Sequence, residues 1–282
     1  MELRGIEMIN TPDESNWYQS NKTAYAEQTT VADYQEADYL EPCESRFIDE
    51  FRTEMVGWAM LDIAVGAGRT TMHFMPLVAN YTGIDYSPPM VEACQAKMDR
   101  ESDKARIRLG DMSDLSDFPD DSIDFVLISY NAISALPEDL RFRTYSEVAR
   151  VLRPGGKFLF STFNLQCIWA RLTLKGTRSL TRPLFTLRKF RDRARWVIRA
   201  NSIRGVLRAM RADAALINDS SHNQRLTHYY IRPHEQVWQL SELFENIRVL
   251  DRDGTEVSDP VQYRRLESDW CFYLCDAVTK SV

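Results

Sequence analysis

Two short segments combine glycine and aspartate in a way that suits a nucleotide-like ligand. Residues 62–68 read DIAVGAG and follow a run of apolar residues. Glycine at these positions lets the backbone approach a ligand closely, because it has no Cβ. Asp85, 17 residues after Gly68, ends a second apolar run. A carboxylate there can accept two hydrogen bonds from a ribose diol. A tight turn without a ligand, or a helix cap at Asp85, remains an alternative at this point.

Two further segments also combine an apolar run with a loop or turn. Asp111 and Met112 come after a short apolar run, where a carboxylate could accept a hydrogen bond from an exocyclic amine and a methionine could pack on a purine. By itself, Asp111 is better explained as a loop acid. Residues 147–160 read as a helix, a Pro-Gly-Gly turn and a strand. The role of this segment is architectural.

The elements around these segments predict an α/β fold. Short apolar runs alternate with amphipathic stretches, which is typical of βαβ units in a doubly wound, mostly parallel, seven-stranded sheet. Such a sheet binds ligands at the carboxyl ends of its strands. We expect strands at 59–65, 80–85, 105–110, 123–130, 156–162, 248–253 and 270–278, and helices near 70–78, 88–100, 137–152 and 233–244.

Together the four segments resemble the class I (seven-strand, Rossmann-like) S-adenosylmethionine-dependent methyltransferase family. The resemblance covers roughly residues 57–163, and the run RVLRPGGKF at 150–158 is its most specific part. The family usually has glycine where this chain has Ala64, which is a mild departure. The resemblance implies S-adenosyl-L-methionine as the cofactor. No metal is expected, because the five cysteines lack the spacing of a zinc site and are better explained as buried thiols.

The resemblance also implies a role for each motif residue. Asp62 would organise the loop or face the methionine ammonium, and the backbone from Ala64 through Gly66 to Gly68 would cradle the methionine part. Asp85 would bind both ribose hydroxyls, and Ser129 would line the methionine end. The adenine would be held by Asp111 and Met112, with Tyr86 beside it.

The acceptor side is less well defined. Tyr130 follows the fourth strand, where the family's enzymes for DNA bases and glutamine often carry Asn-Pro-Pro-Tyr; this chain has Tyr130-Asn131-Ala132 there, which argues against those substrates. Tyr18 and Tyr25 belong to an N-terminal segment that folds over the cofactor in similar proteins, and they either touch a ligand or pack the lid. His228 is the best candidate for a general base, since its pKa can lie near neutrality. A structural histidine is the alternative.

Four regions follow from these patterns. They are an N-terminal helical lid (1–55), a cofactor-binding core (56–163), a basic helical insertion or cap (164–226) and the C-terminal part of the core sheet (227–282). Between Arg171 and Arg211 there are 13 Lys or Arg and one acid, although the whole chain has a net charge of −6. A solvated cap, an anionic small-molecule acceptor or contact with an anionic membrane could each explain this segment, with the cap favoured. Nucleic acid is disfavoured by the acidic remainder.

The expected function is methyl transfer to a small-molecule acceptor by in-line displacement. A catalytically silent methyltransferase-like partner protein is the main alternative. An NAD(P)-dependent oxidoreductase is disfavoured, because threonine stands where its fingerprint needs a third glycine. No apolar run is long enough to cross a bilayer and no signal-peptide pattern is present, so we expect a cytoplasmic protein. The oligomeric state stays open.

Overall fold

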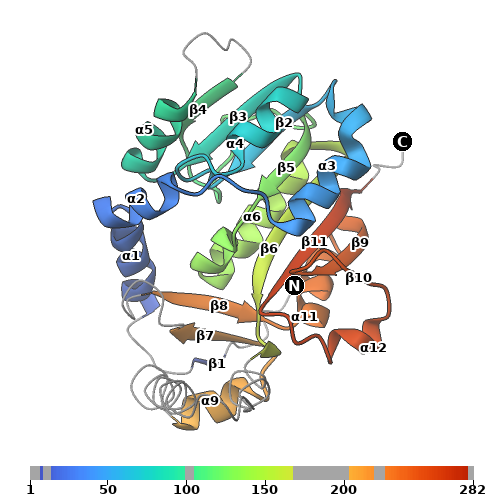
Figure 1. Ribbon diagram of the computed structural model, residues 1–282. Coiled ribbons are helices and arrows are strands. Elements are labelled where there is room, and N and C mark those ends of the chain that lie inside the picture. Colours follow the sequence, from blue (N-terminus) through green and yellow to red (C-terminus); the bar gives the residue numbers. More distant parts are fainter. Residues whose placement is uncertain (1–6, 9–13, 99–104, 168–202, 219–225, 279–282) are drawn as a thin grey trace, which may run out of the picture.

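The computed structural model describes residues 7–8, 14–98, 105–167, 203–218 and 226–278 (Figure 1). Most of the basic segment between 171 and 211 lies outside these residues. Among the described helices, none has the length and apolar character needed to span a membrane.

A central, mostly parallel sheet confirms the predicted α/β fold. Five parallel strands run side by side, and an antiparallel strand, β11, then pairs with both β6 and β9. In spatial order these strands are β4 (Ala105–Leu109), β3 (Asn80–Asp85), β2 (Ala59–Ile63), β5 (Ile123–Ile128), β6 (Leu152–Asn164), β11 (Trp270–Ala277) and β9 (Phe244–Asp251).

Seven strands was too low a number, because the described sheet has eleven. Four are additional: β1 (Glu7–Met8), β7 (Ala214–Asn218), β8 (Thr227–Ile231) and β10 (Glu256–Val257). The antiparallel pair β7–β8 joins the sheet where β6 extends beyond β5, through pairing of Phe163 and Asn164 with β8. The short run 214–218 follows the cationic segment, whose helical pattern gave no sign of a strand.

Helices cover both faces of the sheet, and the strands alternate between two apolar clusters. On β5, Phe125 and Leu127 pack toward α3 (Pro42–Met55), α4 (Thr71–Phe74) and α5 (Pro88–Lys97), whereas Val126 and Ile128 pack toward α6 (Glu138–Val151) and α11 (Pro233–Leu240). Burial on both faces explains why this strand is apolar throughout.

The helix expected at 70–78 is shorter than predicted. It ends at Phe74 and continues as the 3₁₀ turn η1 (Met75–Leu77), where Pro76 lacks the amide hydrogen that an α-helix requires. The remaining short helices are η2 (Ala132–Ala135), α9 (Ile203–Ala209) and α12 (Pro260–Tyr263).

Two helices near the N-terminus, α1 (Glu14–Tyr25) and α2 (Gln28–Gln35), lie at the end of the sheet where the parallel strands terminate, and α1 lies next to β8 (Figure 1). The Asn21 side chain fixes α1 to β8, because it donates to the Thr227 carbonyl (2.7 Å) and accepts from the Thr227 amide (3.2 Å). Trp17 is buried against Leu216 and Tyr229. We call α1 and α2 together the roof. It is held in place by β7 and β8, which lie about 200 residues later in the sequence.

Candidate functional site

A pocket of about 770 Å³, part of which is open to solvent, lies beneath this roof at the carboxyl ends of β2, β3, β4 and β5. This is the position at which doubly wound sheets bind ligands. The pocket is lined by Tyr18, Asn21, Lys22, Tyr25, Tyr34, Ala64, Gly66, Asp85, Tyr86, Met90, Asp111, Met112, Ser129, Tyr130, Ala132, Ala135 and Leu136.

The loop after β2 bends sharply into the pocket. Ala64, Gly66 and Gly68 all have positive φ values (56°, 56° and 82°). Ala64 and Gly66 line the pocket, but Gly68 does not. A Cβ at Gly68 would lie 2.9 Å from the Cys94 Sγ, so this glycine allows the loop to pack against α5. In this structure Gly68 therefore serves the packing of the loop, and its predicted contact with the cofactor stays a prediction.

Asp85 faces the pocket at the end of β3, and its side chain is anchored by backbone amides. One carboxylate oxygen accepts from the Gly66 amide (3.0 Å) and the other from the Ser87 amide (2.9 Å). Burial raises the pKa of Asp85, and these amide hydrogen bonds partly oppose that effect. Each carboxylate oxygen has a second lone pair, so Asp85 can still accept hydrogen bonds from a diol.

Asp62 lies behind the loop and does not line the pocket. Its carboxylate accepts from the hydroxyls of Thr70 (2.6 Å) and Tyr81 (2.7 Å), and its exposed fraction is only 1%. Burial raises its pKa to about 6. Of the two roles expected for Asp62, organising the loop agrees with this placement. Contact with a methionine ammonium does not, because the side chain is directed into the protein.

The other end of the pocket is formed by Asp111 and Met112 from the segment after β4, with Tyr18 and Tyr86 nearby. Lys22 of α1 lies above both tyrosine rings, 4.6 Å from the centroid of Tyr18 and 5.4 Å from that of Tyr86. Its ammonium is 3.9 Å from the Asp111 carboxylate. A charged contact therefore links the roof to the loop that could hold an adenine.

The buried ion pair between Arg69 and Glu44, which the sequence analysis missed, holds the Ser129 side chain by hydrogen bonds. Arg69 donates to both carboxylate oxygens of Glu44 (2.6 and 2.8 Å), to the Ser129 hydroxyl (2.7 Å) and to the Tyr39 carbonyl (2.7 Å). Burial by itself lowers the pKa of Arg69, but the hydrogen bonds and charge of Glu44 outweigh it and the pKa is raised. Arg69 directly follows the glycine motif, but its partner lies 25 residues earlier, and no sequence pattern joins the two.

Tyr130 forms the wall of the pocket after β5. Both Tyr130 and Asn131 have left-handed backbone conformations (φ 55° and 59°), which are strained for residues other than glycine and concentrate at functional sites. The Tyr130 hydroxyl accepts a hydrogen bond from Tyr39 (3.2 Å), and its ring lies edge-on to Trp270, with centroids 4.9 Å apart. Contacts on its outer side thus fix the orientation of Tyr130.

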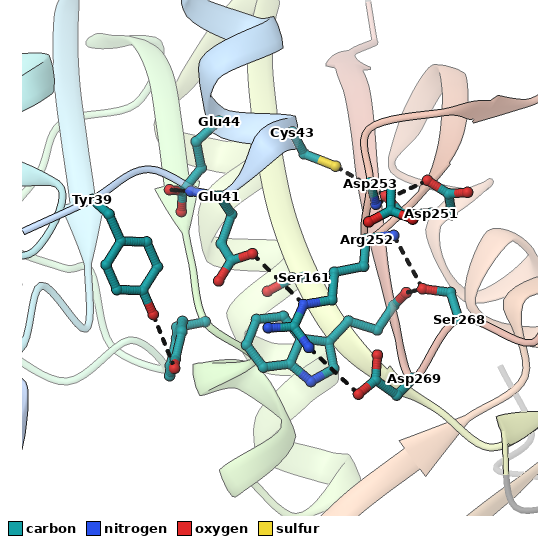
Figure 2. A network of polar contacts seen from close by, with 12 residues as sticks. Tyr39, Glu41, Cys43, Glu44, Ser161, Asp251, Arg252, Asp253, Ser268 and Asp269 are labelled. Atoms are coloured by element: carbon teal, nitrogen blue, oxygen red, sulfur yellow. Dashed lines mark hydrogen bonds and ion pairs between the residues drawn. The ribbon is translucent and has the colours of Figure 1, made fainter. Parts of the chain in front are cut away.

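Figure 2 shows the polar cluster beyond this wall. The Arg252 guanidinium lies 4.3 Å from the centroid of the Trp270 ring, and carboxylate oxygens of Glu41 and Asp269 lie 3.7 and 3.6 Å from its nitrogens. None of these three charged residues lines the pocket, and the cluster contacts Tyr130 only from outside, through the Trp270 ring.

Tyr25 and His228 are in contact, but only Tyr25 lines the pocket. The Tyr25 hydroxyl is 3.1 Å from Nε2 of His228, which is 3% exposed and lies beside Phe163. Tyr34 of α2, which the sequence analysis did not single out, also lines the pocket. Any contact of His228 with an acceptor would therefore have to pass through Tyr25.

Comparison with known proteins agrees with this geometry. A family model described as a methyltransferase domain matches residues 60–156. The uncharacterized methyltransferase YcgJ of Bacillus subtilis is 37% identical over 101 residues, which are 36% of this chain and 38% of that protein. The demethylmenaquinone methyltransferase of Leptospira interrogans is 29% identical over 104 residues, 36% of this chain and 41% of that protein. The matches thus span about two fifths of these relatives.

The fold extends further than the sequence match. The crystal structure of an S-adenosylmethionine-dependent methyltransferase from Mesorhizobium loti superposes with a TM-score of 0.54 at 14% identity, and covers 83% of this chain and 97% of that one. At this identity the likeness shows the fold alone. Residues 60–156 therefore match a methyltransferase domain, and most of the chain shares its fold with that S-adenosylmethionine-dependent methyltransferase.

Proposed function

We propose that the whole protein is an enzyme that transfers the methyl group of S-adenosylmethionine to a small-molecule acceptor in the pocket beneath the roof. The observation that carries this proposal is the convergence of Gly66, Asp85, Asp111 and Ser129 on a single pocket, although they lie at the carboxyl ends of four different strands. The residues present fit the cofactor, because the loop at Gly66 leaves space that a side chain would fill and Asp85 presents acceptor oxygens to the pocket.

Each part of the cofactor has suitable residues. Asp85 would accept hydrogen bonds from the ribose hydroxyls, Asp111 would accept one from the adenine amine, and Met112 would pack on the purine face. Ala64, Gly66 and Ser129 would surround the methionine part. When bound, S-adenosylmethionine supplies a methyl group on a positively charged sulfur that is a good leaving group, so the protein chiefly has to align the acceptor and exclude water.

The acceptor would lie between the roof and the turn after β5. The residues there are mainly aromatic or apolar: Tyr25, Tyr130, Ala132, Ala135 and Leu136. Of the described residues that line the pocket, only Lys22 is positively charged, and Asp111 lies beside it. These features favour a small, largely apolar acceptor over an anionic one. One of the relatives is named as a demethylmenaquinone methyltransferase.

Tyr25 and His228 supply the most suitable groups for proton transfer. An acceptor that loses a proton during attack needs a base within hydrogen-bond reach. Tyr25 lines the pocket, and its hydroxyl contacts His228. We propose that Tyr25 contacts the acceptor and that His228 takes up the proton through it. Tyr130 would hold the opposite side of the acceptor.

Isothermal titration tests the cofactor assignment directly. The wild-type protein should bind both S-adenosylmethionine and S-adenosylhomocysteine, and Asp85→Ala should weaken this binding by about 1.5–3 kcal/mol, the range for losing hydrogen bonds to a charged group. Absence of binding by the folded wild-type protein would refute the proposed function. Transfer of a radiolabelled methyl group to a component of a cell extract distinguishes an enzyme from a catalytically silent partner protein.

A further inference from the structure

Three of the tyrosines that line the pocket have neighbouring rings and form what we call the tyrosine box: Tyr25, Tyr34 and Tyr130. The ring centroids of Tyr25 and Tyr34 are 6.4 Å apart, and those of Tyr34 and Tyr130 are 6.1 Å apart, both in edge-to-face arrangements. Two of the rings come from the roof and the third comes from the turn after β5. The box is therefore complete only while α1 and α2 lie over the sheet.

Tyr34, the middle ring, occupies a defined place along the pocket. It packs against Ala67 of the glycine loop and Met90 of α5. Burial raises the pKa of its phenol most strongly, the nearby phenol of Tyr130 and carboxylate of Asp85 add to this, and Arg69 opposes it. Tyr34 therefore lies near both the carboxylate suited to the ribose and the loop suited to the methionine chain. The sulfur of the cofactor joins these two parts.

The charges around this place favour a cation. Lys22 lies beside Asp111, and Arg69 is paired with Glu44 although its guanidinium also lies 5.3 Å from the centroid of the Tyr130 ring. Each of these two basic groups therefore already has an acidic neighbour. Asp85 has no Lys, Arg or His within ion-pair distance among the described residues. Aromatic faces attract cations through their quadrupole, and this attraction is strongest where water is excluded.

We propose that the tyrosine box recognises the positive charge of the methyl donor and so distinguishes S-adenosylmethionine from its neutral demethylated product. This inference rests on the proposed function. Transfer of the methyl group turns the sulfonium into a thioether and removes the charge, and with it the attraction of the three rings. The product is then held only by contacts common to both molecules, which favours its release and its replacement by a new donor.

The experiment compares three ligands on matched variants by isothermal titration. S-adenosylmethionine and sinefungin carry a positive charge at or near the sulfur position, whereas S-adenosylhomocysteine does not. In Tyr34→Leu, the preference for the two charged ligands over S-adenosylhomocysteine should fall about tenfold, because the desolvated cation–π attraction is worth about 1.4 kcal/mol. Tyr34→Phe keeps the aromatic face and should keep the preference.

Tyr18→Leu is the matched control, since Tyr18 also belongs to the roof and lines the pocket beside Lys22 at the adenine end. It should weaken all three ligands by similar factors. If Tyr34→Leu does the same, the tyrosine box does not sense charge and the inference is overturned, while the proposed function stands. If the folded wild-type protein binds none of the three, the proposed function itself fails. Thermal melting checks folding, and Tyr130→Leu provides the same test should Tyr34→Leu not fold.

Discussion

The Arg69–Glu44 pair allows a sharp test of how the pocket is supported. The Glu44 side chain is fully buried and that of Arg69 is 8% exposed. The Glu44 carboxylate accepts from two Arg69 nitrogens, from the Glu41 amide and from the Ser129 hydroxyl. In Glu44→Gln, one of these acceptor oxygens becomes an amide donor and the negative charge disappears. Arg69 would then be a buried cation without its counter-ion.

Removing one partner of a buried ion pair costs about 3–5 kcal/mol, mostly because the other charge remains unpaired. We therefore expect Glu44→Gln to lower the free energy of unfolding in urea by that amount, with an unchanged m value. The double variant Glu44→Gln/Arg69→Met removes the unpaired charge and should recover part of the loss. A cost below about 1 kcal/mol for a folded Glu44→Gln protein, or strict additivity in the double variant, would refute this account.

Three further variants test other parts of the structure. Ala64→Gly should raise the free energy of unfolding by about 0.5–1 kcal/mol, because the left-handed conformation costs alanine more than glycine loses in entropy; thermal melting measures this, and a lower melting temperature would contradict it. The buried Asp62 has a pKa of about 6, above its usual 3.8, so the native state holds this proton more tightly than the unfolded chain. The free energy of unfolding should consequently fall by up to about 3 kcal/mol between pH 4 and pH 6 and stay level above pH 6. Urea titrations of Asp62→Asn at these pH values should lack this part of the decrease. Asn21→Ala leaves both backbone groups of Thr227 without this partner, so α1 should exchange its amide hydrogens faster than the core helices do.

The sequence was informative wherever local pattern determines position. All seven predicted strands are present, because apolar runs separated by turn residues leave few alternatives in a parallel sheet. Gly66, Asp85 and Asp111 line the pocket because each lies at or just beyond the carboxyl end of a strand, and the carboxyl ends of parallel strands lie at one edge. Strand ends are less reliable: β6 reaches Asn164, two residues beyond its predicted end, and this extension is what pairs with β8.

The sequence could not show which residues of a motif face the ligand. Asp62 and Gly68 belong to the same seven-residue segment as Gly66. The alternation of side chains along β2 directs Asp62 into the protein, and the sharp bend of the loop places Gly68 against Cys94. Contacts between distant segments were equally inaccessible. Nothing in the pattern around Glu44 indicates that it pairs with Arg69, since this depends on how α3 is placed against the loop.

The placement of His228 shows why the roof is central to the proposed chemistry. His228 lies on β8, behind Tyr25 of α1, so the same contact that would carry a proton away from an acceptor also holds α1 in place over the pocket. Tyr25 in turn contacts Tyr34 in the tyrosine box. Movement of α1 would therefore separate the base from the acceptor and open the box at the same time. Under the two proposals above, cofactor recognition and proton transfer both depend on one closed arrangement of the roof, so a variant that displaces α1 should impair both together.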